Sequence, residues 1–306
     1  MSEPPRWLLV VNPSAGRGRG ARLAPRLPDL LARAGVSARI ALSERPGHAG
    51  ELARAAAEAG TRHFAAAGGD GTAHEVVNGL AAYARGRGDT DRLESLAAFS
   101  LSIVPIGTGN DWARSLGLAR SLEASIARLA RGRALACDLG RVHCSGRGQD
   151  ASRLFVNVAG AGFDGFVLER LGHRKPGAWA YLAELLRSHR HFQPPMLAAG
   201  DPPRPTLAVF ACLGSHCGGG MKMAPGARVD DGLLDVTRID AMTGGQLLWE
   251  LRRLFDGSIG RSRHVRTFVA RALEIGSEPA CAVQADGELL GLTPARVEVL
   301  PGAIGV

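Results

Sequence analysis

Short apolar runs alternate with amphipathic segments along the first 140 residues of the chain. The apolar runs cover residues 7–11, 38–42, 64–67 and 101–104, and each precedes a segment in which apolar residues recur at helical spacing, at 22–34, 48–59, 72–84 and 111–116. This alternation is typical of β-α-β units, which build a parallel sheet. We therefore expect an N-terminal α/β domain with an open, mostly parallel sheet.

The pattern changes after Asp138 to short apolar runs separated by turns. The runs predict strands at residues 154–159, 207–213, 233–239, 264–270 and 281–285, with helices at 178–189 and 246–255 and a Pro-rich loop in HFQPPMLAAGDPPRPT. We expect a β-rich second domain at residues 139–289. It follows an α/β domain at residues 1–138, to which a tail at about 290–306 returns.

Four glycine-rich turns connect the predicted strands of the first domain to the helices that follow them. They read NPSAGRGRG, SERPGHAG, GGDGT and PIGTGND, and they gather at the carboxyl ends of the strands, where open α/β sheets bind ligands. Backbone N–H groups and the positive end of a helix suit phosphate at such a place. We predict phosphate cradles at Asn12 to Gly16, at Gly68 to Thr72 and at Gly107 to Gly109.

Asp70 stands among the glycines of GGDGT, directly after an apolar run. The chain has no GxxxxGK[ST], so the lysine of the usual phosphate loop is missing and the phosphate charge must be offset otherwise. Magnesium held by a carboxylate can do this, and Asp70 is well placed to reach a metal-bound water or an attacking hydroxyl. The alternative is that Asp70 is the N-cap of the helix that starts at Thr72.

Charge narrows the choice of partners. The 306-residue chain has a formal net charge of +8, and its 37 basic residues are spread along it, which argues against a nucleic-acid arm. A basic surface favours an anionic membrane or a phosphorylated ligand, although solvated charges explain the balance equally well. We expect peripheral contact with an anionic membrane, motivated also by the arginines at positions 252, 253, 261, 263 and 266.

Two further features bear on the compartment. The N-terminus lacks the apolar region of a signal peptide, and no stretch approaches the ~20 uncharged residues of a membrane span, so a cytoplasmic protein is expected. The five cysteines, at positions 137, 144, 212, 217 and 281, form no CxxC pair and lack zinc-site spacing. We expect buried free thiols, with no disulfide and no zinc.

Six motifs in order resemble the diacylglycerol kinase catalytic-domain family, specifically its bacterial lipid kinases, with sphingosine kinases as more distant relatives. They are VNPSAGRG, RPGHAGEL, GGDGTAHEVVNGL, PIGTGNDWARSLGL, NVAGAGFDG and QADGE, and they span nearly the whole chain. The resemblance implies a phosphofructokinase-like α/β nucleotide-binding domain followed by a β-sandwich domain, with the active site in the cleft between them. It also implies a magnesium-dependent transferase of phospholipid biosynthesis, which phosphorylates a lipid hydroxyl with ATP.

The resemblance also assigns residues to ligands. Contacts with ATP would fall on Asn12, Pro13, Ser14, Ala15, Gly16, Ser43, Gly69, Asp70, Gly71, Thr72, Ala73, His74, Glu75 and Thr108. The stretch RVDDGLLDV resembles the magnesium loop of the family, in which the carbonyls of Arg228 and Leu233 and the carboxylate of Asp231 would bind the ion. The sequence DDG is also a common turn, which is the alternative for this stretch.

The turn QADGELLG supplies the remaining acids. Phosphorylation of an alcohol needs a carboxylate that accepts the hydroxyl proton. Taken alone, ADGE is an ordinary hairpin turn. The resemblance places the general base at Glu288, with Asp286 close by and coupled to the metal; Asp286 and Asp70 stay open as alternatives for the base.

The sequence leaves other functions open. Diacylglycerol is the first expectation for the acceptor, while other lipid alcohols and a homodimeric state stay open. A soluble-metabolite kinase related to NAD kinase would share GGDG but not RPGHAGEL or GTGNDWARSLGL. A dinucleotide-binding oxidoreductase would rest on Gly160, Gly162 and Gly165, which have GxGxxG spacing with Glu184 about twenty residues on.

Overall fold

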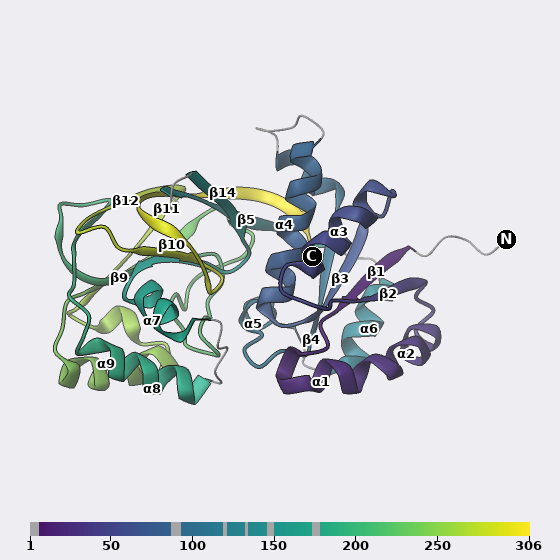
Figure 1. Ribbon diagram of the computed structural model, residues 1–306, viewed down its shortest axis with the longest axis horizontal. Helices are drawn as coiled ribbons and strands as arrows, with labels where there is room; N and C mark the ends of the chain where they lie inside the picture. The colour runs from purple at the N-terminus through teal and green to yellow at the C-terminus, as the bar shows by residue number, and fades with distance from the viewer. Residues whose placement is uncertain (1–5, 87–92, 119–120, 132–133, 146–149, 173–177) are drawn as a thin grey trace. The chain divides into compact units, whose positions relative to one another are not determined.

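The chain folds into two compact units in the computed structural model, which describes residues 6–86, 93–118, 121–131, 134–145, 150–172 and 178–306 (Figure 1). The first unit comprises Met1–Asp138 and Pro301–Val306, and the second comprises Leu139–Leu300. The return to the first unit therefore begins at residue 301, not at about 290. The strand β14 (Glu288–Gly305) pairs inside the second unit up to Glu298, and its Gly305 pairs with Ser100 of the first unit.

A parallel sheet forms the centre of the first unit. Its strands lie in the order β4-β3-β1-β2, and every pair between them is parallel. Their bounds are β1 Trp7–Val11, β2 Ala38–Leu42, β3 His63–Gly68 and β4 Ser100–Pro105. The apolar runs of β1, β3 and β4 are nearly continuous because these strands are buried on both faces.

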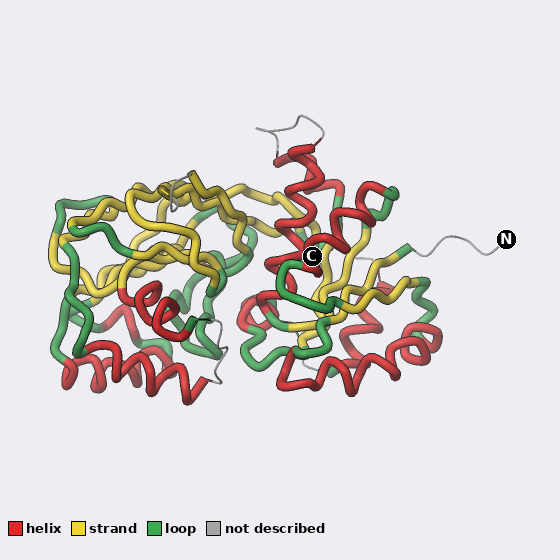
Figure 2. Tube along the Cα trace, viewed as in Figure 1, coloured by secondary structure: helices red, strands yellow, loops and turns green. Residues whose placement is uncertain are grey.

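Helices cover the sheet of the first unit (Figure 2). Their bounds are α1 Ala15–Leu23, η1 Ala24–Arg26, α2 Leu27–Arg33, α3 His48–Glu58, α4 Asp70–Gly86, η2 Leu93–Ala98, α5 Asp111–Ser115 and α6 Leu122–Arg131. Side chains of α2 and α6 pack with Leu9 and Val11 in one buried cluster. Helices α3 and α4 approach so closely that a Cβ on Gly79 would lie 2.1 Å from the carbonyl oxygen of Gly50.

Antiparallel strands build the second unit. They are β5 Ala136–Ser145, β6 Asp150–Phe155, β7 Val158–Gly162, β8 Met196–Ala199, β9 Arg204–Cys212, β10 Leu234–Asp240, β11 Val265–Ala270, β12 Ala272–Glu278, β13 Ala282–Ala285 and β14. The pairings β9-β7-β13-β14-β12-β8-β9 close into a circuit, and inward side chains of these strands form one core cluster. The expected β-rich second half is thereby confirmed.

Three helices pack on a second core cluster of this unit. They are α7 Phe163–Leu171, α8 Ala178–His189 and α9 Gly244–Asp256, and the short helix η3 covers Ile259–Arg261. Two predictions were wrong here. The Pro-rich segment contains β8 and the start of β9, because its backbone pairs with β12, and the strand expected at 154–159 is broken at Val156 and Asn157.

The cysteines behave as expected. All five are buried with free thiols. Burial raises the pKa of Cys212 far above its ordinary value, and the nearby Asp235 carboxylate raises it further. Burial also raises the pKa of Cys281. These thiols are therefore core residues and poor nucleophiles.

Candidate active site

Asn12 organises the turn that follows β1. Its Oδ1 accepts hydrogen bonds from the Ser14 backbone N–H at 3.0 Å and from the Ser14 hydroxyl at 2.7 Å. Its Nδ2 donates to Oγ1 of Thr72, at the start of α4, over 3.4 Å. One asparagine side chain thus ties the first predicted cradle to the second.

Glycine is required at several points of these turns. Gly16, Arg17 and Gly18 all have left-handed φ, at 60°, 59° and 82°, and a Cβ on Gly16 would lie 2.3 Å from the carbonyl oxygen of Ile106. A Cβ on Gly107 would lie 2.5 Å from Cα of Gly69. The turns after β1, β3 and β4 therefore touch through bare backbone, which explains the glycines that the sequence shows there.

Asp70 anchors a helix other than its own. Its Oδ1 accepts the backbone N–H of Trp112 at 2.9 Å, and its Oδ2 accepts the N–H of Asp111 at 3.1 Å, so the carboxylate caps the start of α5. Helix α4 begins at Asp70 itself and not at Thr72. The carboxylate joins the turn after β3 to the turn after β4.

Glu75 does the same for α3. Its Oε2 accepts the backbone N–H of Ala49 at 3.1 Å, in the first turn of α3. The two acids of GGDGTAHE thus cap two neighbouring helices. The first-turn N–H groups of α4 itself carry the positive partial charge that any helix start has, at the carboxyl end of β3.

The other predicted nucleotide residues differ in exposure. Ser43 is buried after β2 and donates its backbone N–H to the carbonyl of Val11 at 2.9 Å. His74 is buried within α4, and its carbonyl accepts a hydrogen bond from Asn78. Thr108 lies exposed in the turn after β4.

Asn110 was missed by the sequence reasoning. Its φ is left-handed at 55°, and its Nδ2 donates to the carbonyl of Gly107 at 2.7 Å. Its Oδ1 is buried and, among the residues that the structure describes, has no hydrogen-bond partner. Such a buried acceptor is suited to a ligand donor. Its signal was present, since it follows directly on the glycines of GTGND.

The second unit carries the turn ADGE as a tight hairpin. Asp286 and Gly287 have φ of 49° and 83°, which suits the two-residue turn that Asp-Gly favours between β13 and β14. The Asp286 carboxylate accepts three backbone N–H groups, those of Val156 at 2.8 Å and of Asn157 and Val158 at 3.0 Å. Glu288 is half-buried at the first position of β14.

Asn157 connects this hairpin to the GSHCG turn. Its Nδ2 donates to the carbonyl of His216 at 2.7 Å, and its carbonyl accepts the N–H of Leu213 at 2.8 Å. Its Oδ1 is a buried acceptor that lacks a partner within the described ranges. Ser215 Oγ lies 2.8 Å from Nδ1 of His216. These polar groups gather beside Asp286.

The dinucleotide fingerprint at Gly160, Gly162 and Gly165 is a packing feature. A Cβ at these positions would lie 2.9 Å from the Val209 carbonyl oxygen, 2.7 Å from the Leu207 carbonyl oxygen and 2.7 Å from Cβ of Ala282, respectively. Strand β7 pairs antiparallel with β9 and β13, so the segment belongs to no β-α-β unit. The oxidoreductase alternative loses its only support.

The predicted magnesium loop supplies hard oxygen donors. Asp231 is exposed, and its Oδ1 accepts the N–H of Leu233 at 3.1 Å. Burial raises the pKa of Asp235, and the Asp231 carboxylate nearby raises it further. Adjacent carboxylates of this kind suit a hard divalent cation, which would relieve their repulsion. Arg228, at the other end of the loop, pairs with Asp230 at 3.2 Å.

The described residues contain no group of three or more His, Cys, Asp or Glu side chains that could hold a metal ion. Within the same ranges, no helix is long and apolar enough to cross a membrane.

Two domain families match the chain. Residues 6–142 match the family described as "Diacylglycerol kinase catalytic domain", and residues 141–306 match "YegS C-terminal NAD kinase beta sandwich-like domain". Together they account for almost the whole sequence, and they meet close to the division between the two units.

Known proteins agree with the family match. The chain is 31% identical to YtlR of Bacillus subtilis (strain 168), over 98% of each chain. It is 33% identical to a YegS-like protein of Pseudomonas aeruginosa, over 89% of this chain and 85% of that one. Both relatives are named as lipid kinases. A crystal structure of a Bacillus anthracis protein, named as a diacylglycerol kinase, superposes with a TM-score of 0.72 at 24% identity. It covers 100% of this chain and 97% of that one, and it shows that the fold is shared.

Proposed function

Because the chain belongs to the lipid kinase family that combines a diacylglycerol kinase catalytic domain with a YegS-type C-terminal domain, we propose that it transfers the γ-phosphoryl group of ATP to a lipid hydroxyl. Diacylglycerol is the first candidate for the acceptor. One observation carries the proposal: the turns after β1, β3 and β4 touch through bare glycine backbone at the start of α4. Backbone amides and a helix start in this arrangement suit the phosphates of a nucleotide.

The first unit would hold the nucleotide. We assign the phosphates to the turn at Asn12–Gly16 and to the start of α4 at Gly69–Glu75, and further contacts to Ser43 and Thr108. The buried Oδ1 of Asn110 is an additional acceptor for a donor on the nucleotide or its bound water. Magnesium, when bound, supplies positive charge that offsets the phosphate charge, and Asp70 is the carboxylate of this region suited to hold it through water.

The second unit would handle the acceptor. The lipid hydroxyl oxygen forms a bond to the γ-phosphorus, its proton passes to the Glu288 carboxylate, and the bond from the γ-phosphorus to the bridging oxygen breaks, which releases ADP. Asp286 is assigned a positioning role, because its three backbone hydrogen bonds fix the hairpin on which Glu288 lies. This revises the expectation that Asp286 is coupled to the metal.

A second magnesium ion would serve structure. The carboxylate of Asp231 and the carbonyls of Arg228 and Leu233 are the proposed ligands. Hard oxygen donors and the raised pKa of Asp235 beside Asp231 support this assignment.

The decisive assay presents γ-labelled ATP to the protein with a total lipid extract and magnesium. A labelled, chloroform-soluble product is the expected result. Label that moves only into water-soluble products would contradict a lipid acceptor and would favour the soluble-metabolite kinase.

Peripheral binding to anionic membranes is part of the proposal. It rests on the net charge of +8 and on the need to reach a lipid substrate. Salt above a few hundred millimolar should release the protein, because attraction between exposed charges fades beyond a Debye length of about 10 Å or less. Vesicle co-sedimentation that does not change with salt would reject it.

A further inference from the structure

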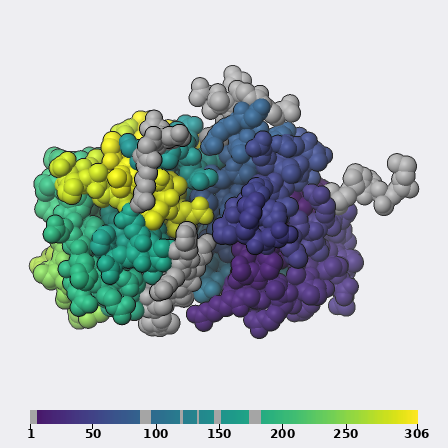
Figure 3. All heavy atoms as spheres, in the orientation of Figure 1, coloured from purple at the N-terminus to yellow at the C-terminus, as the bar shows by residue number. Residues whose placement is uncertain are grey.

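The outer face of α9 exposes large apolar side chains. Leu248 and Trp249 are each 60% exposed and Phe255 is 51% exposed, whereas Leu247, Leu251 and Leu254, on the opposite face, are buried in the core. Atoms of this light green segment are visible at the surface of the second unit (Figure 3). Apolar residues that gather on one exposed helix face mark an interaction surface more often than isolated ones do.

Arginines border this face. The guanidinium of Arg252 lies 3.6 Å from the centroid of the Trp249 ring, which is a cation-π contact. Arg261 and Arg263 are exposed on the segment that follows the helix. Hydrogen bonds from Ser258 lower the pKa of the Asp256 carboxylate, and the charge of Arg252 lowers it further. Arg263 Nε donates a hydrogen bond to Nε2 of His264 at 3.3 Å. Both Arg261 and Arg263 are exposed, and the partner of Arg263 is a histidine, not a carboxylate. These two arginines therefore offer positive charge to an anionic partner.

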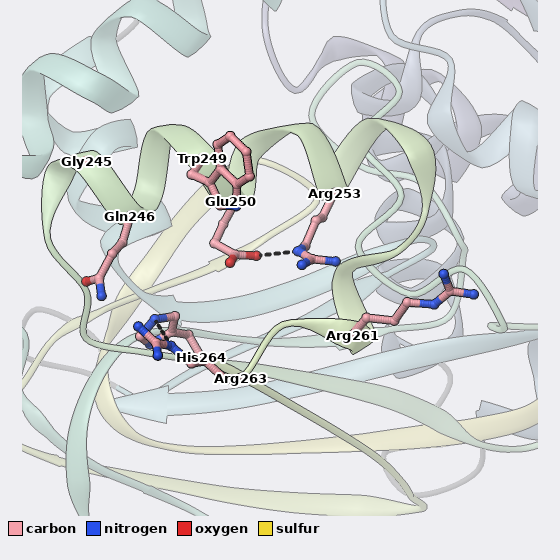
Figure 4. Close-up of a pocket in the computed structure, with 8 residues that line it drawn as sticks. All are labelled: Gly245, Gln246, Trp249, Glu250, Arg253, Arg261, Arg263 and His264. Atoms are coloured by element: carbon pink, nitrogen blue, oxygen red, sulfur yellow. Dashed lines mark hydrogen bonds and ion pairs between the residues drawn. The ribbon is translucent and has the colours of Figure 1, made fainter.

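A pocket of about 460 Å³ lies between α9 and this segment. Its lining consists of Gly245, Gln246, Trp249, Glu250, Arg253, Arg261, Arg263 and His264 (Figure 4). Glu250, the one carboxylate among these lining residues, pairs with Arg253 at 2.8 Å. Three arginines against one glutamate leave the pocket with a net charge of +2 when His264 is neutral.

We propose that this pocket binds the phosphate-bearing headgroup of an anionic membrane phospholipid, while Leu248 and Trp249 enter the interfacial layer beside it. The three elements complement such a surface together: a cavity of headgroup size, arginines that attract phosphate, and an exposed tryptophan of the kind that sits at membrane interfaces. This proposal rests on the proposed function in one respect: a lipid kinase has to reach a membrane.

The first test reverses charge at the pocket. Arg261→Glu with Arg263→Glu is compared with Arg33→Glu with Arg39→Glu, which makes the same change of net charge at exposed sites of the first unit. Co-sedimentation uses phosphatidylcholine vesicles with about 30% phosphatidylglycerol, without ATP. The pocket variant should bind on the order of 10-fold or more weaker than wild type, and the control about 2-fold weaker. Equal losses in both variants would overturn the proposal.

The second test follows Trp249 itself. Brominated phospholipids quench a tryptophan that enters the bilayer. Trp7 and Trp112 are buried and should be insensitive. Trp179, the fourth tryptophan of the chain, is removed by Trp179→Phe in both proteins that are compared. Trp249→Phe should keep vesicle binding and lose most of the quenching. Quenching that is equal with and without Trp249→Phe would overturn the insertion of α9, and thermal unfolding of each variant checks that it is folded.

The two proposals fail separately. On a short-chain acceptor that is dissolved as monomers, the pocket variant should keep wild-type kinase activity, because no residue assigned to the reaction is changed. Weaker vesicle binding without any lipid kinase activity in wild type would leave the headgroup pocket standing and reject the proposed function. If the wild type is an active lipid kinase and the pocket variant binds vesicles as tightly as the wild type, the headgroup pocket is rejected and the proposed function stands. The headgroup pocket is also rejected if the arginines bind nucleic acid or protein and not vesicles.

Discussion

Each unit of the protein contains an aspartate followed by glycine whose carboxylate is tied to distant backbone. In the first unit, Asp70 accepts the N–H groups of Asp111 and Trp112, more than 40 residues along the chain. In the second, Asp286 accepts three N–H groups from a segment about 130 residues earlier. In both units the carboxylate extends a contact that strand pairing begins, because β3 pairs with β4 and β13 pairs with β7.

The surroundings of the two aspartates differ. Asp70 begins a long helix among three glycine turns that touch through backbone, whereas Asp286 occupies a two-residue hairpin turn whose neighbour Glu288 starts a strand. An Asp-Gly pair is therefore weak support for a catalytic aspartate. The neighbouring backbone decides whether phosphate can approach, and this criterion favours Asp70.

The largest effect is expected from Asp70→Asn. The change keeps the shape and one acceptor oxygen but removes the charge beside the proposed phosphate site. We predict that kcat falls on the order of 10²-fold or more while the protein stays folded, with some loss of stability because the Asn amide leaves one of the two N–H groups of α5 without its acceptor. Initial rates of labelled lipid formation measure it, with Asp29→Asn, at an exposed position of α2, as the control.

A result near wild type would assign Asp70 to structure alone. Its carboxylate would then be only the cap of α5, and the contrast between the two aspartates would disappear.

The same substitution at Asp286 should act on stability. Asn tolerates the left-handed φ of 49°. However, its side-chain NH₂ group, a donor, replaces the carboxylate oxygen that accepts the N–H of Val156. We predict a loss of about 2 kcal/mol in the free energy of unfolding, measured by urea denaturation, because a charge-assisted hydrogen bond is lost and a buried N–H is left unmatched. The kcat of the folded fraction should fall less than about 10-fold.

Asp286→Asn that unfolds like wild type but loses kcat as strongly as Asp70→Asn would break the comparison. Asp286 would then be coupled to the metal and the reaction, as the family resemblance implied.

A smaller effect is expected from Asp231→Ala. If this carboxylate holds a structural ion, magnesium should raise the melting temperature of Asp231→Ala less than it raises that of the wild type. The reason is that a ligand stabilises only the state that binds it. Asp230→Ala is the matched control, since Asp230 is the adjacent exposed aspartate and pairs with Arg228. Identical magnesium responses in Asp231→Ala and Asp230→Ala would exclude Asp231 as a specific ligand.

Local patterns were enough to locate most elements of the first unit. Strands β1, β3 and β4 were found because continuous apolar runs end in glycine turns, and helix α3 was found almost to its ends. Helix α6 was missed, although Ser121 before it accepts the N–H of Ala124 as a cap does. Helix α7 was missed because its start lies within the glycine motif NVAGAGFDG, which reads as a turn.

Long-range pairing is what the sequence could not show. Strand β8 forms in a proline-rich segment because residues 196–199 find partners in β12, some eighty positions later. The partners of Asp70 and Asp286 are likewise distant, so the sequence offered them as candidate acids without revealing what their oxygens hold. Asn110 and Asn157 lie in motifs that were noticed, but only burial singles out their side chains.

The central claim is tested most directly by isothermal calorimetry, in which ATP with magnesium is titrated into Glu288→Gln. The labelled-lipid assay is run on the same sample. The claim is that the first unit holds the nucleotide and that Glu288 of the second unit accepts the proton of the lipid hydroxyl. We predict a Kd for ATP close to wild type and no labelled lipid above background. Normal turnover by Glu288→Gln would contradict it and move the base to Asp286 or Asp70, and a Kd weakened about as much as kcat would place Glu288 on the nucleotide instead.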